Sequence, residues 1–309
     1  MWYWQLGDEG FRVLTAKNGN EYIGQSCAYR VKVCVGQDVK EMWWGVDAFV
    51  LEGNRGRGIG SKLQEQMHHD LPNFTSAWYS PTNGAIKRKC GSHGIMEFPF
   101  AYYPVSSYYS ILLELGIERG FHFKIKLPRI RLPWFYSTLN KPCNKQLKGY
   151  EVIEMSLMQL PMLSVFAESC LKEEPFHVIR SEQYLQWKYV DNPRTRCRLL
   201  SISKNHQLVG LVVFSELLKQ NVVHAKSRVV KIYDSLLAPF SGLTHKQMLF
   251  FVADYLRNCG ERIDGFKSLQ KTNWHPSLLY PKRKVVLSTM NTELLPSGYI
   301  TYMDQDMEG

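Results

Sequence analysis

A glycine-rich segment, Arg55-Gly56-Arg57-Gly58-Ile59-Gly60-Ser61, stands between a predicted strand and a predicted helix. Glycines at alternate positions allow a loop to turn consecutive backbone N–H groups toward one point, and the helix that follows adds the positive end of its dipole. This combination predicts a pyrophosphate site. The spacing matches neither the dinucleotide-binding G-x-G-x-x-G nor the P-loop G-x-x-x-x-G-K-[ST], so it is a different signature and a more specific one than a lone G-x-G.

Strands and helices are expected in the order that would position this loop. Three strands precede it, and the third ends where the loop begins. The helix after it carries apolar residues at helical spacing and stops at a proline. The expected strands are Phe11–Ala16, Tyr22–Val35, Val39–Leu51, Thr75–Ser80 and the extended aromatic segment Met96–Tyr103, and the expected helices are Lys62–Leu71 and Pro81–Ser92.

The second half of the chain repeats this order. Its expected elements are a strand Glu151–Leu157, helices Leu160–Leu171 and Glu182–Val190, a hairpin of Cys197–Ser203 and Leu208–Leu218, a strand Val229–Leu237 and a helix Thr244–Asn258. Short matches recur in the same order, such as Asp47-Ala48-Phe49-Val50-Leu51 with Asp234-Ser235-Leu236-Leu237-Ala238, and Gly24 with Gly210. We therefore predict two copies of one α/β unit, in residues 1–104 and 151–309, joined by a connector at 105–150.

Composition limits the class of protein. The chain has 309 residues, of which 45% are hydrophobic and 13% aromatic, so it is a folded protein. Its formal net charge of +10 fits either an anionic partner or simple solubility, and charge alone does not decide between them. Its seven cysteines are scattered and never spaced as C-x-x-C, which predicts reduced thiols in a cytoplasmic protein and no metal site. We expect no signal peptide, because the N-terminus lacks a basic flank and an apolar core. We expect no membrane span, because the most apolar window is interrupted by prolines and glutamates.

The segment Asp47–Leu63 resembles motif A of the GNAT superfamily of acyl-CoA N-acyltransferases, whose pattern is [R/Q]-x-x-G-x-[G/A] after the fourth strand. Arg55, Gly58 and Gly60 occupy its fixed positions, and the stretch from Pro81-Thr82-Asn83 to Gly94-Ile95 is similar to the next helix of the family. The resemblance implies an α/β (α+β) fold with two tandem GNAT-like domains, each a mixed, mostly antiparallel sheet flanked by helices. It also implies that the first strand and helix of the family are missing before Trp2.

The same resemblance implies how the cofactor, acetyl-CoA, is bound. The loop backbone would hold the CoA pyrophosphate, and the end of the preceding strand would hold the pantetheine arm through strand-like hydrogen bonds. The implied cofactor-binding residues are Phe49, Val50, Leu51, Arg55, Gly56, Arg57, Gly58, Ile59, Gly60, Ser61 and Asn83. In the second copy, Pro239-Phe240-Ser241-Gly242-Leu243 stands in place of the loop, and one glycine with a proline cannot present the same row of donors. We expect this degenerate copy to shape the acceptor site or a homodimer contact.

Two residues are candidates for proton transfer. Asp47 lies where several family members place a glutamate and would be the general base, since a carboxylate in an apolar strand is costly to bury without a purpose or a partner. The alternative is a structural aspartate that binds loop backbone, and its recurrence as Asp234 favours this. Cys90 stands where many members carry the tyrosine that reprotonates the CoA thiolate, and it is either that acid or an inert buried thiol. Glu97 and Tyr79 are weaker candidates for the base.

Three functions follow from these observations. The first is an N-acetyltransferase in which a primary amine attacks acetyl-CoA directly in a ternary complex. Tyr184-Leu185-Gln186-Trp187-Lys188-Tyr189 resembles a motif of bacterial tandem GNAT proteins linked to surface polysaccharides, so an amino sugar is the first acceptor to consider. The second is a non-catalytic CoA-binding or interaction module. The third, nucleic-acid binding through the basic connector, is not expected because no recognition motif accompanies it.

Overall fold

The computed structural model describes residues 10–78, 81–105, 149–193, 196–215, 229–261, 263–269 and 284–289. Two compact units divide the chain. The first unit comprises Met1–Pro99, Leu171–Trp187 and Arg283–Gly309, and the second comprises Phe100–Cys170 and Lys188–Lys282. This interleaved division differs from the linear one expected at residues 104 and 150. Residues 106–148 of the expected connector, and the start of the chain where a first strand was expected to be missing, lie outside the described residues.

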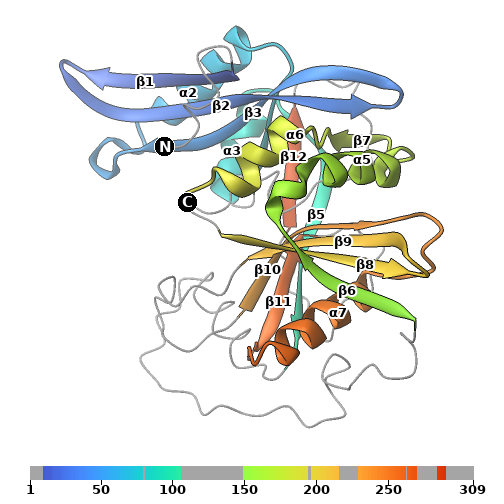
Figure 1. Ribbon diagram of the computed structural model, residues 1–309. Helices are drawn as coiled ribbons and strands as arrows, with labels where there is room; N and C mark the ends of the chain where they lie inside the picture. Colours follow the sequence, from blue (N-terminus) through green and yellow to red (C-terminus); the bar gives the residue numbers. More distant parts are fainter. Residues whose placement is uncertain are drawn as a thin grey trace, which may run out of the picture. The chain divides into compact units, whose positions relative to one another are not determined.

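The first unit is built on a sheet with the strand order β1-β2-β3-β4-β12-β5 (Figure 1). Its antiparallel meander is β1 (Phe11–Asn18), β2 (Glu21–Val35) and β3 (Asp38–Val50), followed by α2 (Ile59–Asp70), β4 (Phe74–Trp78), α3 (Pro81–Lys89) and β5 (His93–Pro104). A strand from far along the chain, β12 (Lys284–Thr289), pairs with both β4 and β5. A short strand, β7 (Phe176–Val178), pairs with the end of β2, and α6 (Glu182–Leu185) follows it.

The core of the first unit lies between α2 and the meander. Burial of an apolar stripe on the helix against one face of the sheet is the main source of its stability. The buried cluster consists of Ala28, Trp43, Met67, Leu71 and Phe74, with Leu14 packed against it. The loop before α2 is therefore attached to a rigid helix.

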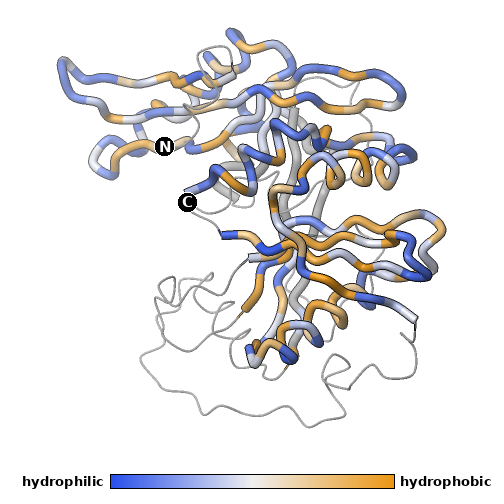
Figure 2. The backbone as a smooth tube through the Cα atoms, viewed as in Figure 1, coloured by the Kyte–Doolittle hydropathy of each residue, from blue (hydrophilic) through white to orange (hydrophobic). Residues whose placement is uncertain are grey.

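The second unit has the strand order β5-β11-β10-β9-β8-β6. Its elements are β6 (Tyr150–Met155), α5 (Leu160–Leu171, of which the last residue belongs to the first unit), β8 (Cys197–Lys204), β9 (Gln207–Ser215), β10 (Val229–Leu237), α7 (His245–Asn258) and β11 (Gly265–Leu269). Figure 2 shows that β8 and β9 are largely hydrophobic whereas α7 mixes hydrophobic and hydrophilic residues. One face of α7 accordingly packs on the sheet, with Met248, Val252 and Leu256 at most 1% exposed.

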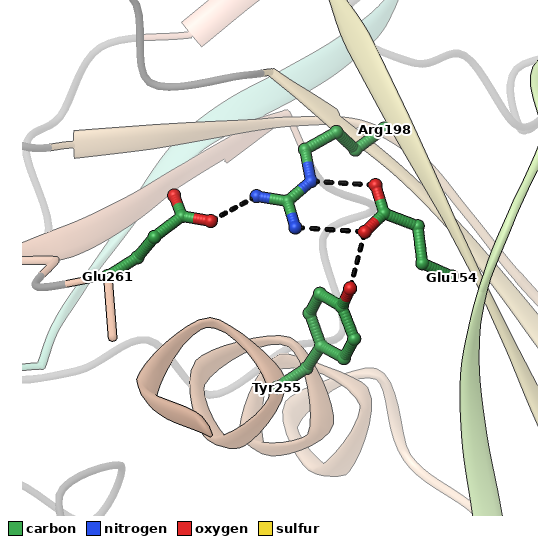
Figure 3. Close-up of polar contacts among 4 residues, drawn as sticks. All are labelled: Glu154, Arg198, Tyr255 and Glu261. Atoms are coloured by element: carbon green, nitrogen blue, oxygen red, sulfur yellow. Dashed lines mark hydrogen bonds and ion pairs between the residues drawn. The ribbon is translucent and has the colours of Figure 1, made fainter. Parts of the chain in front are cut away.

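A polar network joins three elements of the second unit (Figure 3). Arg198 on β8 donates two hydrogen bonds to Glu154 on β6, at 2.8 and 3.0 Å, and a third to Glu261 just beyond α7. Tyr255 on α7 donates to the same Glu154 carboxylate. Bidentate arginine–carboxylate pairs are the strong form of ion pair. Because every group in this network has a partner within it, we assign the network to stability and not to ligand binding.

The strand registers of the two units correspond. Gly24 lies opposite Val50 in the first unit, and Gly210 lies opposite Leu237 in the second, as the sequence correspondence predicts. The parallel pairs also correspond: Trp43–Phe74 and Gly45–Ser76 match Val230–Phe266 and Ile232–Ser268. This aligns Phe74-Thr75-Ser76 with Phe266-Lys267-Ser268, a repeat that the sequence alone did not reveal to us.

The predicted fold class, of mixed sheets flanked by helices, is confirmed, and every strand and helix predicted within the described residues is present. Boundaries differ in places. α2 begins at Ile59 and not at Lys62, because Gly60 is accommodated inside its first turn. The expected second short helix, Glu182–Val190, is an α-helical turn that continues as a π-helical turn from Gln186 to Val190.

Candidate functional site

The glycine-rich loop is held in a conformation that other residues would adopt only with strain. Gly56 and Gly58 both have φ of 78°, in the left-handed region that glycine enters without a steric penalty. A Cβ atom added at either glycine would meet nothing within 4 Å. The glycines therefore serve the backbone path and leave open space above the loop, as the approach of a phosphate group requires.

The loop ends on a helix whose first amides are available to a ligand. Gly58 is the N-cap of α2 and makes no side-chain capping bond, and the first hydrogen bond of the helix runs from Lys62 N to Gly58 O at 3.1 Å. The N–H groups of Ile59, Gly60 and Ser61 consequently have no acceptor within the helix. Such a helix end binds an anion through backbone N–H groups and the helix dipole.

Basic side chains surround these amides. Arg55, Arg57 and Lys62 are exposed at the loop and at the start of α2. Arg55 donates from Nε to the carbonyl oxygen of Val50, at 3.1 Å, so the guanidinium also fixes the end of β3. This bond uses one of its five N–H donors.

Among the described residues, strand β3 has no partner strand on one of its edges directly before the loop. On one side it pairs with β2 as far as Val50. On the other side its pairing with β4 stops at Gly45, opposite Ser76, although β3 continues to Val50. We call this opening between β3 and β4 the fork. Phe49 and Leu51, at its mouth, are 48% and 41% exposed. The backbone of residues 46–50 can thus offer strand-like hydrogen bonds to an extended polar ligand.

Asp47 lies at a β-bulge in β3. The register slips there, so that Cys27 pairs with Val46 and Gln25 with Phe49, and Asp47 has φ of 44°. Bulges redirect side chains and are common beside active sites. Its Oδ2 atom is buried and has no hydrogen-bond partner among the described residues. The carboxylate lies close enough to Cys27 to act on it: burial, together with Asp47, raises the pKa of that thiol to about 12.

Cys90 lies at the other end of the site. It follows α3, and its Sγ lies 3.7 Å from the carbonyl oxygen of Ser61 in the first turn of α2. Burial, with a smaller contribution from Glu65, raises the pKa of the thiol. The structure thus places Cys90 against the start of α2, which follows the glycine-rich loop, and Asp47 at the bulge of β3. Asn83 belongs to the first turn of α3, but its side chain lies outside the described residues, as do those of Glu97 and Tyr79.

A buried polar chain beneath the fork was not predicted from the sequence. Ser26, on β2 opposite the bulge, accepts a hydrogen bond of 2.9 Å from Gln64 of α2, and Gln64 accepts one from the ammonium of Lys87 on α3. Burial lowers the pKa of Lys87 to about 7. No sequence signal singles it out, because Lys87 stands in a run of three basic residues with Arg88 and Lys89.

The corresponding loop of the second unit is closed. The N–H groups of Ser241 and Leu243 are bonded to Ala238 O and Ser241 Oγ. Helix α7 starts with a capping box, in which Thr244 and Gln247 each bond the backbone N–H of the other. The amides of Ser241, Leu243, Thr244 and Gln247 are therefore occupied at the second loop, where a phosphate would have to break these bonds.

The described residues contain neither a cluster of metal-binding side chains nor a helix that could span a membrane. Nowhere in that part of the chain do three or more His, Cys, Asp or Glu side chains converge as a metal site would require. The helices described there are too short or too polar to cross a bilayer. The six cysteines among these residues are free thiols.

Comparison with known proteins relates the fold to solved acyltransferases. No protein-family model and no curated protein sequence matches the chain. Among solved structures, a GCN5-related N-acetyltransferase from Anabaena variabilis superposes with a TM-score of 0.56 at 13% identity, over 94% of this chain and 65% of the other. A probable N-acyltransferase from Enterococcus faecalis gives 0.57 at 11% identity, over 93% and 63%.

Saccharomyces cerevisiae N-myristoyltransferase with bound myristoyl-CoA gives a TM-score of 0.56 at 10% identity, over 93% of this chain and 72% of the other. The chain spans just under two thirds of the length of the first two structures. At these identities the likeness concerns the fold, and it extends over both units. The chain has the fold of the GNAT superfamily of acyl-CoA N-acyltransferases.

Proposed function

We propose that the protein is an N-acetyltransferase that transfers the acetyl group of acetyl-CoA to a primary amine. The observation that carries the proposal is one continuous path along the first unit. An open strand edge at residues 46–50 leads directly into a loop with unoccupied helix amides and three exposed cations. This path matches the two polar parts of CoA, an extended pantetheine arm and a pyrophosphate.

Each predicted residue has a role in this proposal. The backbone of residues 55–61 and Asn83 hold the pyrophosphate, and Phe49–Leu51 hold the pantetheine arm. The thioester then lies at the bulge, where the Asp47 carboxylate takes a proton from the acceptor ammonium. The free amine attacks the thioester carbon within the ternary complex, the C–S bond breaks, and the CoA thiolate leaves and is reprotonated.

Cys90 is the proposed donor of that last proton, but its surroundings favour a lesser role. The thiol already contacts the Ser61 carbonyl, and burial raises its pKa. A CoA thiolate is stable enough in water to be released without an enzymic acid. We therefore expect Cys90 to matter less than Asp47.

The second unit contributes no CoA site in this proposal, because four amides of its loop and helix start already have acceptors. We assign it to the acceptor, or to a homodimer contact, and take an amino sugar as the first acceptor class. The free thiols of the described cysteines are in line with a cytoplasmic location. The second candidate function, a non-catalytic CoA-binding module, is favoured by one observation only, the engagement of Cys90 with Ser61.

Thiol release decides between the two functions. Wild-type protein is incubated with acetyl-CoA and a panel of amino sugars, primary alkylamines and peptides, and free CoA is measured with a thiol reagent. We expect release that depends on one class of amine and is lost in Asp47→Asn. Tight binding of acetyl-CoA without turnover by any amine would support the non-catalytic module.

A further inference from the structure

The closed end of the fork is plugged by one aromatic ring. The last paired residue of β3 is Gly45, and the ring of Phe74, the first residue of β4, lies against it. A Cβ atom on Gly45 would be only 2.6 Å from Cζ and 2.9 Å from Cε2 of Phe74. Because real Cβ atoms do not approach other atoms so closely, the ring fills the space of a side chain at this position.

Three neighbours fix the ring of Phe74. His68 of α2 packs edge-to-face on it with ring centroids 4.7 Å apart, and the Lys87 ammonium lies 5.2 Å from the ring centroid. Trp43, which pairs with Phe74 in the parallel ladder, is 9% exposed, and Phe74 itself is 3% exposed. Aromatic and cation–π contacts of this kind are specific in geometry. The plug is therefore rigid, and a ligand cannot displace it at low cost.

We propose that Phe74, seated against Gly45, sets the acyl length of the donor: the fork accepts a short acyl group and rejects a long one. The inference rests on the proposed function, in which the thioester lies at the Asp47 bulge. From there the acyl chain continues down β3, away from the pyrophosphate loop. The distance from Asp47 to Gly45 is two residues, or ~7 Å of strand, which leaves room for an acyl group of only a few carbons.

The second unit has a different residue at the position equivalent to Gly45. Ile232 stands where Gly45 stands in the first unit, and Phe266 stands where Phe74 stands. Both are buried, at 3% and 0% exposure, so the second unit carries an ordinary aliphatic side chain at the position of Gly45. The exchange of isoleucine for glycine in the first unit brings the phenylalanine ring up to the strand backbone. Phe266 is consequently a matched control for Phe74.

The test is calorimetric titration of CoA, acetyl-CoA and octanoyl-CoA into the wild type, Phe74→Leu and Phe266→Leu. We expect the wild type to bind octanoyl-CoA at least ~10-fold more weakly than acetyl-CoA, the order of discrimination that pocket size provides. In Phe74→Leu, the ratio of the Kd for octanoyl-CoA to the Kd for acetyl-CoA is at least ~3-fold smaller than in the wild type, while the affinity for CoA stays the same. Phe266→Leu leaves the ratio unchanged.

The inference is overturned if the wild type binds octanoyl-CoA as tightly as acetyl-CoA. It is also overturned if folded Phe74→Leu keeps the wild-type ratio, or if Phe266→Leu changes the ratio equally. Should Phe74→Leu fail to fold, Phe74→Met decides in its place, because methionine fills irregular gaps while opening the plug. Failure of CoA itself to bind the folded wild type would instead overturn the proposed function, and the inference with it.

Discussion

Asp47 combines two features that are each uncommon for an aspartate. Its backbone is in the left-handed region, at φ of 44°, and one carboxylate oxygen is buried without a partner among the described residues. Both features cost free energy, and residues that carry such costs cluster at functional sites. The equivalent aspartate of the second unit, Asp234, instead accepts a hydrogen bond from Tyr189 at 3.1 Å. The structural interpretation that suits Asp234 does not explain Asp47 equally well.

Replacement of Asp47 by asparagine separates catalysis from folding. Asparagine tolerates the left-handed backbone as well as aspartate does, so Asp47→Asn should fold and bind acetyl-CoA normally. Loss of the base should lower kcat ~10²- to 10⁴-fold. Steady-state kinetics with the matched variant Asp234→Asn, expected to retain kcat, checks this. A folded Asp47→Asn enzyme with unchanged kcat would assign Asp47 to structure.

The sequence alone identified some residues of the candidate site and missed others. The loop glycines and Asp47 could be named because their types are unusual in a strand or recur at a fixed spacing. Lys87 and Phe74 could not, because a lysine on a helix and a phenylalanine in a strand are ordinary in sequence. Their significance lies in contacts made across α2, α3 and β4, between residues that are distant in the chain.

Helices α2 and α7, which occupy equivalent places in the two units, differ in how their N-terminal amides are capped. Helix α7 starts with a capping box, which stabilises a helix by ~1 kcal/mol. Helix α2 starts at a glycine that provides no cap. Under the proposed function, stability is given up at the helix end that binds the pyrophosphate and kept at the end that does not. The sequence predicted both helices, but it could not show which amides were occupied.

Helix α3 brings a buried cation beneath the fork, and this predicts a pH dependence of stability. Burial lowers the pKa of Lys87 from 10.5 to about 7. Between these values the unfolded chain binds a proton that the folded chain does not, so this group makes the free energy of unfolding rise with pH. The rise should be visible between about pH 7 and pH 9, because at higher pH the Cys27 thiol ionises in the unfolded chain but not in the folded one, and this opposes the rise.

Thermal unfolding of the wild type and Lys87→Met across this range measures the effect. The melting temperature of the wild type should rise relative to that of Lys87→Met, because methionine does not titrate. The surface variant Lys89→Met controls for the loss of one positive charge. Parallel curves for wild type and Lys87→Met would show that Lys87 keeps an ordinary pKa in the folded protein.

At the scale of the whole molecule, the two units are not continuous pieces of chain. The sheet of the first unit is completed by β12, which pairs with residues 75–78 of β4 at one edge and with the first half of β5 at the other. The second half of β5 pairs with β11 in the second unit. The sequence predicted the repeat, since local patterns carry it. It could not predict that β12 joins the sheet of the first unit or that β5 pairs with strands of both units, since strand pairing between distant segments leaves no local pattern.

Removal of the chain after Arg283 should therefore damage the proposed CoA site although no loop residue is deleted. Without β12, the edges of β4 and β5 lose their ladder and the fork loses its support. We expect the truncated protein to aggregate or to bind acetyl-CoA at least ~10-fold more weakly. The full chain with a short tag added after Gly309 serves as the control. Wild-type affinity in a soluble truncated protein would contradict the described role of β12.

The central claim is that the first loop, and not the second, binds CoA. Gly58 and Gly242 both have positive φ, of 78° and 65°, and a Cβ at either would meet nothing within 4 Å. Gly58→Glu and Gly242→Glu thus impose the same strain and charge on the two loops. Calorimetric titration of acetyl-CoA should show wild-type binding retained in Gly242→Glu and lost in Gly58→Glu. Equal effects of the two variants, or no binding by the folded wild type, would contradict the claim.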